Sequence, residues 1–348
     1  MAYAHPELAH PFTLFGSFEV GWRYARRVSV AWSRRNFLAI TATLAGSTVL
    51  AGCGGDKPGT VAKDGSVTVT HAFGETRIPA PPTRVVSAGL TEHDDLLAVG
   101  VVPIAVTDWF GGEPFGVWPW ARSQLGSAQP TVLSLGDGIQ IEAIRALNPD
   151  LIVATNAGLD AGTYTTLSDI APTVAQSGSA AFFEPWKDQA TIIGQAVFKA
   201  DEMAALIAGV DETFTNAASA NPQFGGKKAL LLRGPLYRDS VQAVRPGWRT
   251  DFLTQMGFTV ADPGDPLIPR DRMASVLDAA DVLIWTTESE QEQGALLADP
   301  TIAGLKAVAG GRTIFTDKEL AGAIAFASPL SYPLVADRLP PLLAQTLA

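Results

Sequence analysis

The sequence predicts an α/β protein with two Rossmann-like lobes, each built on a mainly parallel sheet, joined by a single long α-helix. Short apolar strands alternate with helical segments from residue 84, a pattern typical of parallel sheets covered by helices. The same alternation begins again near residue 229. Between the two series, residues 201–220 lack proline and repeat apolar side chains at helical spacing. A helix of that length spans about 30 Å, enough to cross two lobes.

Residues 1–52 are predicted to be a signal peptide with an N-terminal extension. Arg34 and Arg35 precede an apolar run of about 14 residues, which is shorter than the ~20 needed to span a bilayer. The run ends in Leu-Ala-Gly-Cys, which resembles a bacterial lipobox, and the paired arginines resemble a twin-arginine export signal. Cys53 is therefore the expected lipidation site. The alternative is a buried helix that contains a chance cysteine.

Composition excludes several classes of function. The net charge of −10 becomes −13 without the leader, because five arginines and two glutamates leave with it, and an acidic surface disfavours nucleic acid. Cys53 is the only cysteine, so we expect no disulfide and no thiol nucleophile. Only His71 and His93 remain after processing, too few for a multi-histidine metal site. We expect no resident metal and no cofactor.

The elements of the first half follow in order. Residues 53–66 are rich in Gly, Lys and Asp and are expected to form a lipid-anchored flexible linker. The N-terminal α/β lobe, residues 67–185, opens with an alternating hairpin over residues 67–78. Its further strands are expected at 84–87, 101–106, 150–154 and 173–174, and its helices at 92–99, 141–147 and 164–170.

The second half repeats this plan. Residues 186–222 are expected to form the linking helices, and Asn221-Pro222 with Gly225-Gly226 ends them. The C-terminal α/β lobe then covers residues 223–348. Its strands are expected at 229–232, 259–260, 281–285 and 313–315, and its helices at 250–256, 272–277 and 329–347.

The candidate ligand residues lie in loops that leave the predicted strands. Open α/β sheets bind ligands beyond the carboxyl ends of their strands, and here those loops are rich in aromatic residues. Rings with interspersed arginines suit a flat, conjugated, partly anionic ligand. A tryptophan in such a loop can equally cover the core. The residues expected to contact ligand are Trp109, Trp118, Trp186, Tyr237, Arg238 and Arg249.

Four stretches of the chain resemble the substrate-binding lipoproteins of ABC importers for ferric siderophores, haem and cobalamin. They cover residues 82–86, 96–103, 141–152 and 164–174. The resemblance implies docking on a permease through one acidic residue on each lobe, Glu142 and Asp271. Asp271 departs from the family's glutamate, and Glu288 or Glu290 could take its place. Either acid could instead serve only as a favourable charge at a helix N-terminus.

The resemblance further implies an exported, monomeric protein, lipid-anchored at the outer face of the cytoplasmic membrane. It would capture a ferric siderophore and deliver it to an ABC permease. Haem is the nearest rival and would need an axial donor, for which His93, Tyr164 and Tyr237 are available. Cobalamin is a further alternative. An enzyme is not expected, since the chain lacks a Gly-x-Ser-x-Gly elbow, a phosphate loop and zinc-ligand spacing, although a hydrolase in the cleft is the alternative from another class.

Overall fold

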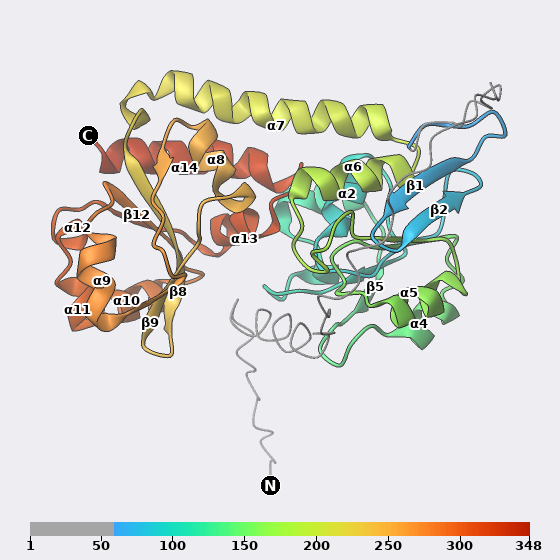
Figure 1. Ribbon diagram of the computed structural model, residues 1–348, viewed down its shortest axis with the longest axis horizontal. Coiled ribbons are helices and arrows are strands. Elements are labelled where there is room, and N and C mark those ends of the chain that lie inside the picture. The colour runs from blue at the N-terminus through green and yellow to red at the C-terminus, as the bar shows by residue number, and fades with distance from the viewer. Residues whose placement is uncertain (1–58) are drawn as a thin grey trace, which may run out of the picture.

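The computed structural model describes residues 59–348. Two α/β lobes lie side by side along the long axis, and one long helix runs across both of them (Figure 1). This arrangement confirms the predicted fold class. The predicted signal peptide and the lipidation site at Cys53 lie outside the described residues.

Lobe 1 contains a hairpin and a five-stranded parallel sheet. The hairpin pairs β1 (Val67–His71) with β2 (Gly74–Ile78) in antiparallel register. The sheet has the order β5-β4-β3-β6-β7, and every neighbouring pair is parallel. Its strands are β3 (Val85–Ser87), β4 (Ala105–Thr107), β5 (Thr131–Leu133), β6 (Leu151–Ala154) and β7 (Thr173–Ala175). Its helices are α2 (Glu92–Ala98), α3 (Arg122–Leu125), α4 (Ile141–Ala146) and α5 (Ala161–Ser168), with the 3-10 turns η1 (Pro114–Gly116) and η2 (Pro119–Ala121).

Lobe 2 has a mixed sheet of order β11-β9-β8-β12-β13, with β10 also paired to β8. Strands β10 (Thr259–Val260), β12 (Val282–Thr286) and β13 (Thr313–Phe315) belong to its parallel part. Strand β8 runs over Lys228–Tyr237, beyond the predicted end at residue 232, and returns as β9 (Ser240–Ala243). The turn residues Arg238 and Asp239 have φ of 47° and 63°, as a tight hairpin turn requires. This hairpin and β11 (Leu267–Pro269) make the edge antiparallel.

Short helices surround the lobe 2 sheet. They are α8 (Asp251–Gln255), α9 (Arg270–Leu277), α10 (Glu290–Ala298), α11 (Pro300–Ala303), α12 (Lys306–Ala309), α13 (Lys318–Phe326) and α14 (Ser331–Thr346), with the 3-10 turns η3 (Pro222–Phe224) and η4 (Trp248–Thr250). Helix α14 packs beside the long connecting helix (Figure 1).

Two helices connect the lobes. Helix α6 (Trp186–Ala196) lies on lobe 1, and α7 (Ala200–Ala220) is the predicted long helix, beginning one residue earlier than expected. Asp211, near the middle of α7, accepts hydrogen bonds from Lys187 of α6 at 2.6 Å and from Gln255 of α8 at 2.7 Å. The long helix is thus bonded to elements on both sides of the boundary.

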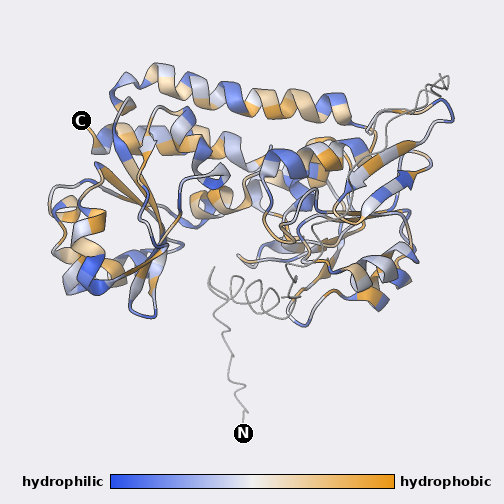
Figure 2. Cartoon of the chain, in the orientation of Figure 1, coloured by the Kyte–Doolittle hydropathy of each residue, from blue (hydrophilic) through white to orange (hydrophobic). Residues whose placement is uncertain are grey.

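Apolar side chains gather on the sheets and on the inner faces of the helices. Figure 2 shows hydrophobic colour along the sheet strands and alternating colours along α7. On α7 the buried residues are Met203, Val210 and Phe214, which contact the lobe 2 core. Within residues 59–348, none of the helices combines the length and the apolar character needed to cross a membrane.

Candidate ligand-binding site

A pocket opens at the carboxyl end of β12, where Thr286 pairs with Arg233 in the middle of β8, and an open α/β sheet is expected to receive its ligand beyond the ends of its parallel strands. Arg233 and Arg249 line it, and none of its other residues carries a charge. Apolar and hydroxyl side chains complete the wall. We call this site the arginine pocket: Leu231, Arg233, Val244, Arg249, Thr286, Ala321, Ile324 and Ala325.

Arg249 is held by a short turn and by two aromatic rings. It belongs to η4, where Gly247 and Thr250 exchange hydrogen bonds of 2.9 and 3.1 Å. Its guanidinium carbon lies 4.5 Å from the ring centre of Trp248 and 4.7 Å from that of Phe183. Phe183 belongs to lobe 1, so this cation–π contact crosses between the lobes.

Burial lowers the pKa of both pocket arginines. The pKa of Arg233 falls to about 10 through desolvation alone, and that of Arg249 falls to about 9 through desolvation together with the charge of Arg233. Both values stay above neutrality, so both guanidinium groups remain charged at pH 7. Within residues 59–348, no carboxylate forms an ion pair with Arg249.

Phe183 is fixed from within lobe 1. Its backbone N–H donates to Oδ1 of Asn156 at 2.8 Å, and the N–H of Asn156 donates to Oε1 of Glu92 at 2.7 Å. Phe183 holds a left-handed φ of 56°, which this bond helps to maintain. The neighbouring Phe182 lines a second, apolar pocket in lobe 1 together with Leu135, Gly138, Ile139, Ala157, Gly158 and Thr163. Charged and apolar pockets thus flank the Phe182–Phe183 pair.

Tyr237 and Arg238 lie at the end of the β8–β9 hairpin rather than in the arginine pocket. Arg238 is exposed, and its guanidinium carbon is 5.0 Å from the ring centre of Tyr237. The structure therefore brings only Arg249 of the six predicted ligand residues into this pocket. Their contact with ligand stays a prediction.

The tryptophans of the 109–120 loop pack against lobe 2. Trp118 is 1% exposed and stacks on Trp120, with ring centres 4.8 Å apart, while Trp109 is 9% exposed. Both rings also face Phe326 of α13. A side-chain carbon added at Gly322 of α13 would lie 2.6 Å from the Trp118 ring, so the two surfaces meet without spare room. This burial does not support the predicted ligand contacts of these two tryptophans.

Trp186 is buried as well. Its ring is 6% exposed and meets Tyr332 of α14 edge to face, with ring centres 5.4 Å apart. It belongs to the core cluster that α7 and α14 share with lobe 2. Its position at the start of α6 therefore serves packing between the lobes, and its predicted ligand contact is not supported either. Trp285 is fully buried in β12.

A buried polar contact lies beside these rings. Asp94 of α2 accepts hydrogen bonds from Ser328 of lobe 2 at 2.6 Å and from the indole N–H of Trp120 at 2.8 Å. Burial raises the pKa of Asp94 to about 6 and that of Glu92 to about 7. We call the whole interlobe contact the seam: Asp94, Trp109, Phe110, Trp118, Trp120, Lys318, Phe326 and Ser328.

The proposed axial donors for haem are dispersed. His93 is fully buried, its ring lies beside Phe326, and burial lowers its pKa to about 4. Tyr164 stacks on Phe73 and contacts His71, on the side of lobe 1 that carries the hairpin. Tyr237 is at the hairpin of lobe 2. In the part of the chain from Gly59 onwards, no group of three His, Cys, Asp or Glu residues could hold a metal ion.

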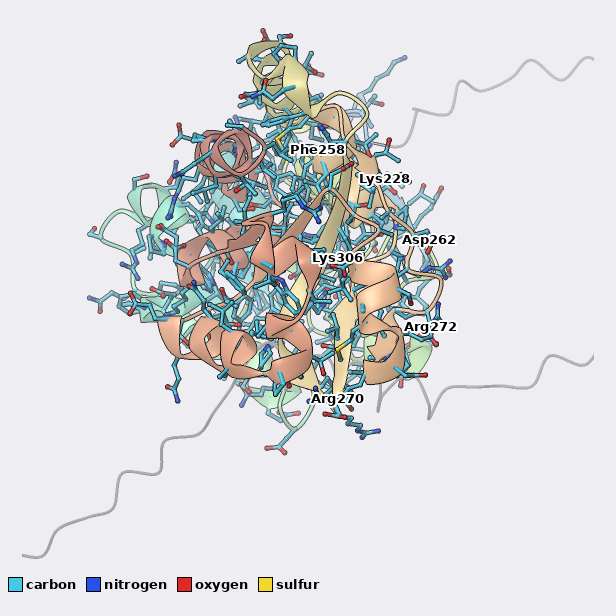
Figure 3. All side chains as sticks on the ribbon, turned by 90° about the vertical axis from the view of Figure 1, so that its left-hand side faces the viewer. Lys228, Phe258, Asp262, Arg270, Arg272 and Lys306 are labelled. Atoms are coloured by element: carbon cyan, nitrogen blue, oxygen red, sulfur yellow. The ribbon has the colours of Figure 1, made fainter. Side chains whose placement is uncertain are left out.

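The two acids expected to dock on a permease occupy matching positions. Glu142 is the second residue of α4 and Asp271 the second residue of α9, and both are exposed. Glu142 lies 3.6 Å from Arg145. Arg270 and Arg272 flank Asp271 on the edge of lobe 2 away from α7 (Figure 3). Arg270 is paired with Asp299 and Asp239.

Sequence reasoning missed Arg233, Phe183 and the polar contact of Asp94 as parts of the interlobe region. The sequence did offer a signal for Arg233, because this residue directly follows the predicted strand 229–232 and ligands bind beyond the carboxyl ends of such strands. Asp94 and Ser328 are separated by 234 residues, and no local pattern indicates their contact.

Comparison with known proteins agrees with this architecture. A family model described as periplasmic binding protein matches residues 85–320. The chain is 30% identical over 230 residues to the putative ABC transporter substrate-binding lipoprotein YhfQ of Bacillus subtilis (strain 168), covering 64% of this chain and 68% of that protein. It is 32% identical over 160 residues to the Fe(3+) dicitrate-binding periplasmic protein FecB of Escherichia coli (strain K12), covering 45% and 51%.

A solved structure extends the likeness to both lobes. A periplasmic solute binding protein from Mycobacterium smegmatis str. MC2 155 is 73% identical with a TM-score of 0.81, and the match covers 82% of this chain and all of that one. The family match itself spans more than half of the present chain, from the first strand of the lobe 1 sheet to α13 of lobe 2. The chain belongs to the periplasmic binding protein family.

Proposed function

We propose that this protein captures a ferric siderophore between its lobes and delivers it to the permease of an ABC importer. The observation that carries the proposal is the arginine pocket, which lies at the carboxyl end of β12 and whose Arg249 stacks on Phe183 of the other lobe. A ferric siderophore already fills the coordination shell of its iron. Such a ligand needs oxygen-binding cations and apolar walls from the protein, and no metal ligands.

The relatives support iron as the cargo. FecB, 32% identical over its matched part, is named for binding ferric dicitrate, and YhfQ is named as a substrate-binding lipoprotein of an ABC transporter. Family membership supports binding without chemistry. Haem, the rival ligand, is disfavoured by the burial of His93 and by the position of Tyr164 away from the arginine pocket.

Attachment and docking complete the proposal. Cys53 would carry the lipid that holds the exported, monomeric protein at the outer face of the cytoplasmic membrane. Glu142 and Asp271 would meet arginines of the permease, one on each lobe. Support for this role comes from their exposure and from their equal positions, each at the second residue of a helix.

The test is a titration of intrinsic tryptophan fluorescence. The full chain, purified in mild detergent, is titrated in parallel with ferric siderophores, haem and cyanocobalamin, with correction for absorption by the coloured ligands. We expect saturable quenching by at least one ferric siderophore and recovery of that ligand unchanged. Saturation by haem alone, with a Soret shift, would indicate that the ligand is haem and not a siderophore. Absence of saturation by every ligand would overturn the proposal.

A further inference from the structure

We infer that Arg270 positions the docking acid Asp271 by tying the first turn of α9 to two neighbouring elements of lobe 2. The guanidinium of Arg270 bridges α9, the β8–β9 hairpin and α11. This role rests on the docking function proposed for Asp271, through which Arg270 would act on the permease.

All three nitrogen atoms of the Arg270 guanidinium donate hydrogen bonds. Nε donates to Oδ1 of Asp239, in the turn of the β8–β9 hairpin, at 2.6 Å. Nη1 and Nη2 donate to the two carboxylate oxygens of Asp299 at 2.9 and 2.8 Å, and Nη1 also donates to the hydroxyl of Thr301 at 3.0 Å. A forked pair of this kind fixes direction as well as distance. The guanidinium is therefore held in one orientation between the hairpin and α11.

The two acids that hold Arg270 are themselves fixed. Asp299 is the N-cap of α11 and accepts from the backbone N–H groups of Thr301 and Ile302 at 2.9 and 3.2 Å. The hydrogen bond from Arg270 lowers the pKa of Asp299, which keeps this carboxylate charged. Asp239 lies in a hairpin turn with a φ of 63°. Arg270 thus joins the start of α9 to two points whose backbone is already constrained.

The first turn of α9 depends on this contact. Helix α9 follows β11 directly, and its N-cap residue, Pro269, makes no side-chain hydrogen bond to the helix. The buried residues of α9, Met273 and Leu277, lie further along it. Asp271 is exposed in the first turn. The position of its carboxylate therefore follows from the direction in which Arg270 holds this turn.

The contact lies on the side of the molecule where both docking acids are found. Figure 1 shows α9, α11 and the β8–β9 hairpin on the side of lobe 2 away from α7, and α4 of lobe 1 lies on the same side. Figure 3 shows Arg270 at that edge. A partner that contacts both lobes must meet Glu142 and Asp271 at a fixed separation. Displacement of one acid would therefore weaken docking at both.

Lobe 1 has a comparable tie at the start of α4. Gln140, the N-cap residue of α4, accepts a hydrogen bond at Oε1 from the backbone N–H of Ser134 at 3.1 Å. Ser134 directly follows β5, so this bond joins the start of the helix to a neighbouring strand. Each helix that carries a docking acid is thus tied at its start by a long side chain.

Charge alone predicts the opposite effect of losing Arg270. Arg270→Gln removes the cation that pairs with Asp239 and Asp299, so the surface around Asp271 becomes more negative. Arginines of the permease would then be attracted more strongly. Loss of positioning weakens docking instead. The direction of the effect therefore separates the two explanations.

The experiment measures uptake of isotopically labelled iron by cells in which each variant replaces the chromosomal copy of this protein. Ferric dicitrate, ferric staphyloferrin B, ferrichrome and ferrioxamine B are tested, and the probe is the complex that saturates the purified full chain in the fluorescence titration. We expect Arg270→Gln to lower uptake by roughly threefold or more without a change in probe affinity. Arg270→Lys, which keeps the charge but not the fork, should lose less.

Arg338→Gln is the matched control. Arg338 is 35% exposed, against 37% for Arg270, and it also pairs with two acids of lobe 2, Asp317 and Glu319. This variant should take up iron as the unmodified protein does. Immunoblots of the membrane fraction correct uptake for the amount of each variant, and thermal unfolding of the purified apo proteins verifies that they are folded.

A double variant tests whether Arg270 acts through Asp271. Asp271→Asn removes the docking charge, so addition of Arg270→Gln should lower uptake no further. Independent structural damage would instead multiply the two losses. Where Arg270→Gln does not fold, Asp239→Asn removes one arm of the contact and should lower uptake in its place.

The outcomes separate the role of Arg270 from the proposed function. Unchanged or greater uptake for Arg270→Gln, while Asp271→Asn lowers it, would overturn the positioning role and leave docking in place. Multiplied losses in the double variant would overturn it as well. Unchanged uptake for Asp271→Asn would remove docking by lobe 2 together with this role, and siderophore capture would stand. Failure of every probe to saturate the folded protein would remove both proposals.

Discussion

The seam and the arginine pocket both lie between the same two lobes, and both combine aromatic rings with charged groups. In the seam the rings pack on one another and on α13, and the carboxylate of Asp94 is hydrogen-bonded to Ser328 and Trp120. In the arginine pocket the rings stack on a single guanidinium that has no ion pair with residues 59–348. The seam is therefore a packed interface, whereas Arg249 borders a pocket.

This difference teaches that a loop rich in aromatic residues can serve as packing between the lobes. The 109–120 loop carries three tryptophans, and packing uses them to hold lobe 1 against α13. Lys318 of α13 adds polar contacts to the same loop, donating to the carbonyl of Gly111 at 2.5 Å and to Glu113 at 2.8 Å.

The largest effect on stability is expected from Trp118→Ala. The ring is fully buried between the lobes, so its loss leaves a cavity and should lower the free energy of unfolding by about 3–5 kcal/mol. Urea unfolding measures the change. Phe115→Ala in the same loop is the control, because Phe115 is 37% exposed and should cost less than about 1 kcal/mol. Similar losses in the two variants would show that the seam is not packed as described.

Asp94→Asn should change how stability depends on pH. Burial raises the pKa of Asp94 from 3.8 to about 6, so between these pH values the folded protein keeps a proton that the unfolded chain has released. Stability contributed by this group is therefore present below pH 4 and is lost as pH rises through 6, by up to about 3 kcal/mol. The Asp94→Asn variant should not lose this stability as pH rises, because an amide does not titrate in this range. Its amide oxygen can still accept a hydrogen bond from Ser328.

Urea unfolding at a series of pH values from 4 to 8 measures this difference. Asp188→Asn, an exposed acid on α6, is the control and should keep the pH profile of the unmodified protein. Glu92, whose pKa burial raises to about 7, remains in every variant and supplies a common background that declines between 4.5 and 7. Parallel profiles for Asp94→Asn and the unmodified protein would contradict the prediction.

Lys318→Met should have a smaller effect. Its amino group joins α13 to the lobe 1 loop but is 43% exposed, so solvent screens its pair with Glu113 and the loss should not exceed about 1 kcal/mol. Lys199→Met provides the matched control, because Lys199 is 42% exposed and reaches Glu202 at the same 2.8 Å, from the N-cap of α7 to its first turn and not between the lobes. Thermal unfolding should show the greater loss for Lys318→Met. A greater loss of thermal stability for Lys199→Met would contradict a stabilising contact of Lys318 between the lobes.

The smallest effect on the purified protein is expected from Glu142→Gln and Asp271→Asn. Both side chains are exposed at helix N-termini and neither belongs to the seam or to the arginine pocket, so stability should change by less than about 0.5 kcal/mol and siderophore affinity should not change. Uptake of ferric siderophore by cells that express the importer should fall for each variant and fall further for the double variant. Unchanged uptake by the double variant would contradict the proposal that Glu142 and Asp271 dock on the permease.

Much of the fold could be predicted because its signals are local. Apolar strands such as 151–154 and the helical spacing of Met203, Val210 and Phe214 indicate buried faces without knowledge of their partners. The antiparallel edge of lobe 2 was missed, since it depends on a hairpin turn at Arg238 and Asp239 in which neither residue is glycine or asparagine.

The sequence by itself determined the two-lobe α/β plan, the long connecting helix and an acidic surface that leaves anion binding to a few cations. Only the tertiary structure decided which aromatic residues pack and which charges stay available. Trp118 and Arg249 were both expected to contact ligand, and no local pattern separates them. Their environments differ because Trp118 lies against Gly322, which is 204 positions along the chain, whereas Arg249 borders a pocket beside Phe183. Contacts at such separation depend on how the lobes meet.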